Sequence, residues 1–189
     1  LYSQGAERFE STFEKIYTAE SLTRIPWYAI AGNHDHGGNV TAEIGYTTNP
    51  QNRPLHGINP WTKKPLPAKR WTMPNYWHNI TQRFEVGGKP VELEVLLFDS
   101  CVMAGNSDVI NEDGSVTELK LSQLPGPPDP ALANEQLEWI EARMKASTAD
   151  FLWVGGHYPV WAIGNDPPTG VEEQLRPLLN RWEAHYFNG

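Results

Sequence analysis

The 189-residue chain contains 39% hydrophobic and 20% charged residues, a composition that excludes a disordered or fibrous protein. Its 15 Lys+Arg against 23 Asp+Glu give a formal net charge of −8, which argues against nucleic acid as a partner. No run approaches the roughly 18 apolar residues that a membrane span needs, so we expect no membrane partner. Four basic residues gather among prolines, where a solvated surface is expected: Lys63, Lys64, Lys69 and Arg70.

Helical and extended patterns alternate along the first part of the chain. Apolar side chains recur at helical spacing over 8–17, and the apolar run 27–31 predicts a short buried strand that ends at Gly32. A short helix is expected over 42–46. Six prolines interrupt residues 49–74, which predicts a long irregular insertion there.

The second part begins with a predicted β-hairpin, formed by extended segments over 76–86 and 91–99 around Gly87-Gly88. A second irregular stretch, 105–130, precedes an amphipathic helix over 131–146. A strand over 151–154, a helix over 171–182 and a strand over 185–187 follow. This order predicts a single α/β domain over 1–189, with a parallel or mixed sheet covered by helices.

Two loops place glycine and histidine directly after an apolar strand. They read Gly-Asn-His-Asp at 32–35 and Gly-Gly-His-Tyr-Pro at 155–159. In α/β proteins, the loops that leave the carboxyl ends of strands hold the ligand site. Asn offers an oxygen ligand and His a nitrogen ligand, both suited to Fe, Zn or Mn. One histidine after a strand is more often structural, but two such loops together predict a metal site.

These motifs resemble those of a known enzyme family. Gly-Asn-His-Asp after an apolar strand resembles the central motif of the calcineurin-like metallophosphoesterases. Gly-Gly-His-Tyr-Pro-Val-Trp at 155–161 resembles the matching segment of the purple, tartrate-resistant acid phosphatases of the small mammalian type. The likeness covers nearly the whole chain except 49–74. It implies an α/β sandwich of two mixed β-sheets flanked by helices, here the central part of a catalytic domain truncated at both ends.

The resemblance also implies a reaction and a set of site residues. It implies a dinuclear centre, Fe(III) beside Fe(II), Zn or Mn, that hydrolyses phosphate monoesters of small molecules or phosphoproteins. Asn33 and His157 would bind the second metal. His34 would face the phosphate and stabilise or protonate the leaving-group oxygen. Asp35 would orient His34. Tyr2 is the candidate for the tyrosinate ligand of iron, and a tyrosine without function near the chain end is the alternative.

Three further positions carry expectations. Asp166 falls where the family has a second substrate-facing histidine, so it would stand on the substrate side. Asn39 and Asn79 begin Asn-x-Thr sequons, which predict glycosylation if the protein is secreted or lysosomal. A bacterial, periplasmic protein would leave both sequons unused.

The remaining ligands of the family's centre have no counterpart in the sequence. We therefore expect residues 1–189 alone to be inactive and to bind metal poorly, and we expect the parent protein to be a monomeric enzyme. A phosphodiesterase or protein phosphatase of the same superfamily remains an alternative. A non-catalytic module that keeps the fold is another.

Overall fold

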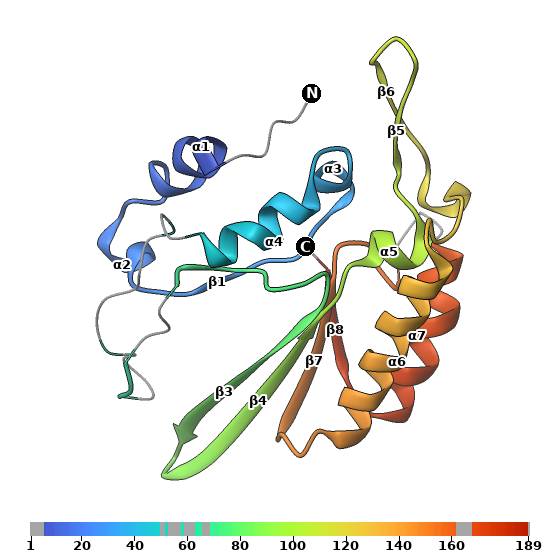
Figure 1. Cartoon of the computed structure of the whole chain (residues 1–189). Helices are drawn as coiled ribbons and strands as arrows, with labels where there is room; N and C mark the ends of the chain where they lie inside the picture. Colours follow the sequence, from blue (N-terminus) through green and yellow to red (C-terminus); the bar gives the residue numbers. More distant parts are fainter. Residues whose placement is uncertain are drawn as a thin grey trace.

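A four-stranded mixed sheet organises the molecule (Figure 1). The computed structural model describes residues 6–49, 52, 58, 63–65, 69–161 and 168–188. In the sheet, β3 (His78–Val86) and β4 (Lys89–Leu97) are antiparallel. β7 (Phe151–Gly156) and then β8 (His185–Asn188) continue the sheet parallel to β4. The predicted α/β class, with a mixed sheet and covering helices, is confirmed.

The predicted hairpin is confirmed, with its register running from His78 opposite Leu97 to Val86 opposite Lys89. Gly87 and Gly88 have φ angles of 58° and 80°. A two-residue turn between strands of right-handed twist needs positive φ at both central positions, and glycine adopts it without steric cost. The turn therefore fixes which side chains of β3 and β4 face the helices.

Helices α6 (Pro130–Ala146) and α7 (Thr169–Arg181) cover one face of the sheet (Figure 1). The carboxylate of Asp129 accepts hydrogen bonds from the amides of Ala131 and Leu132, which caps the start of α6. We call the β3-β4-β7-β8 sheet with these two helices the sheet region. Its fully buried side chains include Leu96, Phe98, Ile140, Val154 and Leu175.

The N-terminal part builds a second, smaller core. It contains α1 (Ala6–Phe9), a π-helical turn (Glu10–Glu14), α2 (Glu20–Thr23) and α4 (Val40–Thr48). Phe9 stacks on Tyr46 at 3.9 Å between ring centroids, and Phe13 meets Trp27 and Trp71 edge-on, each at 5.3 Å. These five side chains define the aromatic region.

The 49–74 insertion contributes to this core, which corrects the expectation of irregular structure throughout. Within it, β2 (Trp71–Thr72) pairs in parallel with β1 (Trp27–Tyr28). The strand expected over 27–31 is therefore only two residues long. A two-residue strand such as β2 carries no periodic signal, so the sequence pattern did not reveal it.

Arg70 also departs from the expected solvated basic surface. Its side chain is buried, and its Nη1 donates to Glu14 Oε2 at 2.8 Å. The guanidinium lies 4.4 Å from the ring centroid of Phe13, a cation–π contact. A buried carboxylate partner and an aromatic face thus hold this charge inside, whereas Lys63 and Lys64 are exposed as expected.

The second stretch expected to be irregular, 105–130, holds a small hairpin and a 3₁₀ turn (Leu121–Gln123). The hairpin pairs β5 (Asp108–Ile110) with β6 (Val116–Glu118). Two short helices, α3 (Asn33–His36) and α5 (Ser100–Ala104), also lacked a sequence signal. Across the described ranges, no helix has the length and apolar character needed to cross a bilayer.

Candidate metal centre

Three segments converge near the ends of β4 and β7: the short helix α3, residues 105–108, and the loop that begins at His157. Asn33, the first residue of α3, is buried at 6% exposure. The Gly32 amide donates to Asp35 Oδ2 at 2.8 Å, which closes the first turn of α3. A Cβ atom on Gly32 would lie 3.1 Å from the His157 ring, so glycine permits the close approach of these segments.

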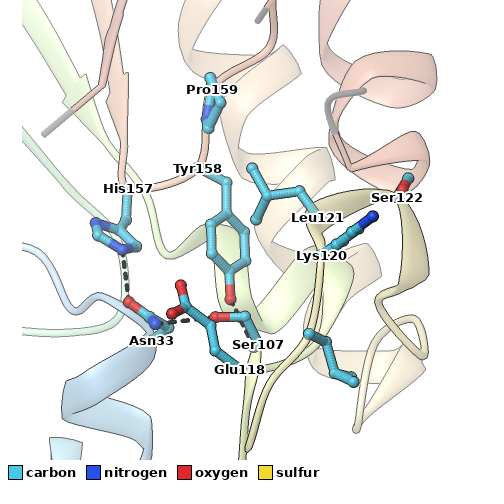
Figure 2. A pocket seen from close by; sticks show the side chains of 10 residues that line it. Asn33, Ser107, Glu118, Lys120, Leu121, Ser122, His157, Tyr158 and Pro159 are labelled. Carbon is cyan, nitrogen blue, oxygen red and sulfur yellow. Dashed lines mark hydrogen bonds between the residues drawn. The ribbon is translucent and has the colours of Figure 1, made fainter. Parts of the chain in front are cut away.

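The orientation of the Asn33 amide is fixed by its hydrogen bonds (Figure 2). Its Nδ2 donates to Ser107 Oγ at 2.9 Å, as Figure 2 shows. It also donates to Asp108 Oδ1 at 3.0 Å. Its Oδ1 consequently faces His157, whose Nε2 lies 2.8 Å away. Because Oδ1 is an acceptor, the shared proton belongs to Nε2 of His157.

This pair fits a metal ion. Oxygen and nitrogen ligands at about 2.0–2.2 Å from one ion lie about 3 Å apart when the angle between them is near 90°. Oδ1 of Asn33 and Nε2 of His157 are 2.8 Å apart, with the amide already turned to present its oxygen. The structure therefore brings together the two side chains predicted to share one metal.

His34 lies beside this pair and is largely exposed, with 70% of its side chain accessible. Its Nδ1 lies 2.8 Å from Oδ2 of Asp108, a carboxylate whose side chain is 4% exposed. The sequence expectation that Asp35 orients His34 is thus corrected. Asp35 stands at the third position of α3, from which its carboxylate reaches back to the Gly32 amide.

Tyr158 links residues 105–108 to the His157 loop. Its hydroxyl accepts from the Ser107 amide at 2.9 Å and donates to the Gly105 carbonyl at 3.2 Å. Burial raises the pKa of this hydroxyl well above its ordinary value, so it remains a donor across physiological pH. The same Ser107 that holds Asn33 is therefore held by the neighbour of His157.

Two hollows adjoin these residues. The larger, about 580 Å³, is lined by Asn33 and His157 together with Tyr158, Glu118 and Lys120 (Figure 2). The smaller, about 300 Å³, is lined by His34 with Arg8, Phe9 and Thr12 among others. Consecutive residues of α3 thus face separate spaces, one next to the predicted metal ligands and one next to the predicted acid.

Within the described part of the chain, His36, Asp99 and Cys101 form one compact cluster of potential metal ligands. Burial, and then the nearby Asp99 carboxylate, raise the pKa of the Cys101 thiol, which keeps it protonated. Asp99 Oδ1 accepts from two backbone amides, and His36 Nε2 lies 2.7 Å from its Oδ2. These contacts indicate a hydrogen-bonded cluster rather than a second metal site.

The other predicted residues fall into two groups. Tyr2 and Asp166 lie outside the described residues. Asn39 and Asn79 are both exposed, Asn39 as the cap of α4 and Asn79 on β3, where its amide donates to Glu94. Sequence reasoning did not predict the contacts that Ser107, Asp108 and Tyr158 make at this site. A usable signal was the polar Asn-Ser-Asp that follows the buried α5 and Gly105.

Known proteins with similar sequences include acid phosphatases, although no family model matches the chain. Human tartrate-resistant acid phosphatase type 5 is 35% identical over 175 residues, covering 92% of this chain and 45% of that protein. Purple acid phosphatase 17 of Arabidopsis thaliana is 43% identical over 191 residues, covering 100% of this chain and 47% of that protein. The chain thus spans about half the length of these curated relatives.

Among solved structures, one described as "GAP50 the anchor in the inner membrane complex of Plasmodium" is similar with a TM-score of 0.69. At 18% identity, it covers 100% of this chain and 51% of its own, which supports the fold alone. Several tartrate-resistant acid phosphatases align over more than nine-tenths of this chain. These relatives and purple acid phosphatase 17, which are 32–43% identical to it, support its assignment to the purple acid phosphatase family of metallophosphoesterases.

Proposed function

We propose that the full-length parent protein of this chain is an acid phosphatase that hydrolyses phosphate monoesters at a dinuclear metal centre. The observation that carries the proposal is the convergence of Asn33 Oδ1 and His157 Nε2 at 2.8 Å, with His34 beside them. Membership of the family implies a dinuclear centre. We infer Fe(III) with Fe(II), Zn or Mn, with Asn33 and His157 as ligands of the second metal and Tyr2 as the candidate tyrosinate ligand.

A dinuclear centre, when bound, neutralises phosphate charge and supplies an activated nucleophile near neutral pH. The protein's own contribution is the general acid. Asp108 accepts the hydrogen bond of His34 Nδ1–H, which turns Nε2 outward toward solvent. When both ring nitrogens are protonated, Nε2–H can protonate the leaving oxygen as the P–O bond breaks. General acids of this kind contribute about 10²–10⁴ in rate.

The proposed substrates are small phosphomonoesters or phosphorylated protein side chains. The phosphate would lie in the larger hollow, beside Asn33 and His157. The leaving group would extend over His34 toward the smaller hollow, which Arg8, Phe9 and Thr12 help to line. Asp166 is the proposed further substrate-side residue.

We also propose that the protein acts as a monomer outside the cytosol, in a secreted, lysosomal or periplasmic setting. The exposure of Asn39 and Asn79 supports glycan attachment at both positions in a eukaryotic secretory pathway. The test is expression in secreting eukaryotic cells, followed by glycosidase treatment. The treatment should reduce the mass of the protein in two steps, one for each glycan. A mass that does not change would contradict glycosylation at both positions.

The activity of the full-length parent protein is tested with p-nitrophenyl phosphate after loading with iron and zinc. We expect hydrolysis, and a kcat lowered about 10²–10⁴-fold by His34→Ala. His185→Ala changes an exposed histidine on β8 and serves as the matched control. Absence of turnover in the loaded protein would contradict the proposal, and faster hydrolysis of the bis-ester would favour a phosphodiesterase. The prediction that 1–189 alone is inactive is tested in the same assay.

A second candidate is a binding module that keeps the fold without catalysis. A protein of similar fold is described as an anchor, so the fold itself is compatible with a role other than catalysis. The two candidates differ at His34, which a binding module does not need. Full metal occupancy without any turnover, unchanged by His34→Ala, would support the module.

A further inference from the structure

Asp99 and Ser100 follow the last strand residue of β4, and both are fully buried. We call these two residues the β4 corner. Fully buried polar side chains at the carboxyl end of a central strand need partners, because an unsatisfied group there is costly. The partners of these two residues lie in α3, in the loop that begins at His157, and in α5, which precedes residues 105–108.

The first link runs to α3. Nε2 of His36, the last residue of that helix, lies 2.7 Å from Asp99 Oδ2, and the His36 side chain is 19% exposed. An aspartate has no proton to offer at Oδ2 when ionised, so the histidine is the donor. Asn33 and His34 therefore sit on a single turn that is fixed at its start by Asp35 and at its end by Asp99.

The second link runs to α5, the helix that precedes residues 105–108. Asp99 Oδ1 accepts from the amides of Cys101 at 2.9 Å and Val102 at 3.2 Å, which caps α5. The chain continues from that helix through Gly105 and Asn106 to Ser107 and Asp108, the acceptors of the Asn33 amide. One carboxylate thus bonds to α3 and to the helix that leads to the acceptors of Asn33.

The third link runs to the loop after β7. Ser100 Oγ accepts from the amide of Tyr158 at 2.8 Å, which places the residue next to His157 against the end of β4. The corner itself is immobilised by Gln136 of α6, whose side chain exchanges two hydrogen bonds of 2.9 Å with the Asp99 main chain. The sheet region thereby provides a rigid support for all three segments.

We propose that Asp99 and Ser100 are the positioning residues that hold Asn33 and His157 in register as metal ligands, acting through His36 and Tyr158. The inference rests on the proposed ligand roles of Asn33 and His157. Neither Asp99 nor Ser100 touches the metal or the substrate. Residues that orient ligands in this way commonly change metal affinity about 10- to 100-fold when they are altered.

The test uses the full 189-residue chain labelled with ¹⁵N, without metal, in four forms: parent, His36→Gln, His36→Leu and Ser100→Ala. Gln keeps a donor near the position of Nε2, whereas Leu removes it. In the parent, we expect a single Nε2–H tautomer for His157 and slowly exchanging Asn33 side-chain amide protons. His36→Leu and Ser100→Ala should mix the His157 tautomers and speed Asn33 exchange about tenfold, and His36→Gln should preserve both signals.

His185→Leu is the control, because it makes the same chemical change at an exposed site on β8. A folded His36→Leu protein with parental His157 and Asn33 signals would overturn the Asp99 part of the proposal. Parental signals in Ser100→Ala would overturn the Ser100 part. If His36→Leu does not fold, His36→Asn replaces it, since its shorter amide does not reach Asp99 and should give the same loss.

A Co²⁺ titration of the full-length parent protein separates this proposal from the proposed function, because residues 1–189 alone are expected to bind metal poorly. We expect the affinity to fall about 10- to 100-fold in its His36→Leu variant and to stay within a few-fold of the unsubstituted protein in His36→Gln. An unsubstituted full-length protein that binds no Co²⁺, while the variants of the chain still disturb His157, would contradict the ligand roles and leave the positioning intact. Equal Co²⁺ affinity in the unsubstituted full-length protein and its His36→Leu variant would overturn the positioning.

Discussion

In the sheet region, α6 and α7 cover the strands with apolar side chains such as Ile140 and Leu175, whereas in the aromatic region the rings surround a buried ion pair between Arg70 and Glu14. The first arrangement distributes its stabilisation over many small contacts of similar kind. The second contains one buried charged pair, and removal of a single partner leaves an unpaired charge inside. The two regions should therefore respond differently to single substitutions.

The largest effect is expected at the ion pair. Arg70→Met should lower the free energy of unfolding by about 3–5 kcal/mol, because Glu14 would remain buried without its partner. Chemical denaturation measures the loss, and hydrogen exchange locates it. We expect faster exchange at the β1–β2 ladder and unchanged protection in β4. The double variant Glu14→Leu/Arg70→Met should recover most of the stability, and a double variant as unstable as the single one would contradict this explanation.

A pH effect is expected at His78, where β3 begins. Neither ring nitrogen has a hydrogen-bond partner among the described residues, and burial lowers its pKa from 6.5 to about 4. Below about pH 6.5, the His78 side chain is therefore protonated in the unfolded chain, whereas in the folded chain it stays neutral down to about pH 4. Stability should fall by about 3 kcal/mol between pH 7 and pH 4, and this group should contribute no further loss below about pH 4.

His78→Phe should remove that part of the pH dependence. The measurement is the difference between unfolding free energies at pH 7 and pH 4, compared across variants. His185→Phe, at an exposed position of β8, should retain the parental difference. Equal differences in the parent and His78→Phe would show that His78 is not the source.

Two adjacent glycines of β7 allow a comparison between a buried and an exposed side chain within the sheet region. A Cβ atom on Gly156 would lie 2.5 Å from the Phe98 ring, which is fully buried. On Gly155 it would meet Phe187, whose side chain is 41% exposed and can move. Gly156→Ala should cost about 2–3 kcal/mol and Gly155→Ala clearly less, as measured by thermal unfolding. The reverse order would indicate that the interior around Phe98 is loosely packed.

The smallest effect is expected at the start of α6. Asp129→Ala removes the acceptor for the amides of Ala131 and Leu132 and should cost about 1 kcal/mol. Asp129→Asn should retain most of that stability, because its side-chain oxygen can still accept both bonds. Denaturant midpoints compare the two variants, and equal losses would argue against a capping role.

The sequence predicted the elements whose signals are local. Helix α6 carries its own apolar stripe, and the β3–β4 hairpin carries its own turn, so both were expected close to their observed bounds. Strand β2 was missed because its two residues lie among prolines and pair with a strand 44 positions away. Arg70 was wrongly expected at the surface, because its partner Glu14 is 56 residues distant.

In the candidate metal centre too, features with a local sequence signal were predicted and contacts between distant residues were not. The two loops that carry Asn33 and His157 were identified from their motifs, and the structure brings these side chains together. The partner of His34 was not predicted correctly. Asp35 is its sequence neighbour, but the local bond to the Gly32 amide takes that carboxylate, and Asp108 arrives from 74 residues away. Such partners depend on tertiary geometry that no local pattern encodes.

The sequence separations of these contacts also bear on the order of folding. The β3–β4 hairpin closes through a two-residue turn, which costs little chain entropy and forms within microseconds in isolated hairpins. The Asn33 amide must meet Ser107 across 74 residues and His157 across 124. Contacts of such long range are expected to form late. The Asn33–His157 contact would then be among the last parts of the molecule to assemble, so its appearance would report that folding of the chain is complete.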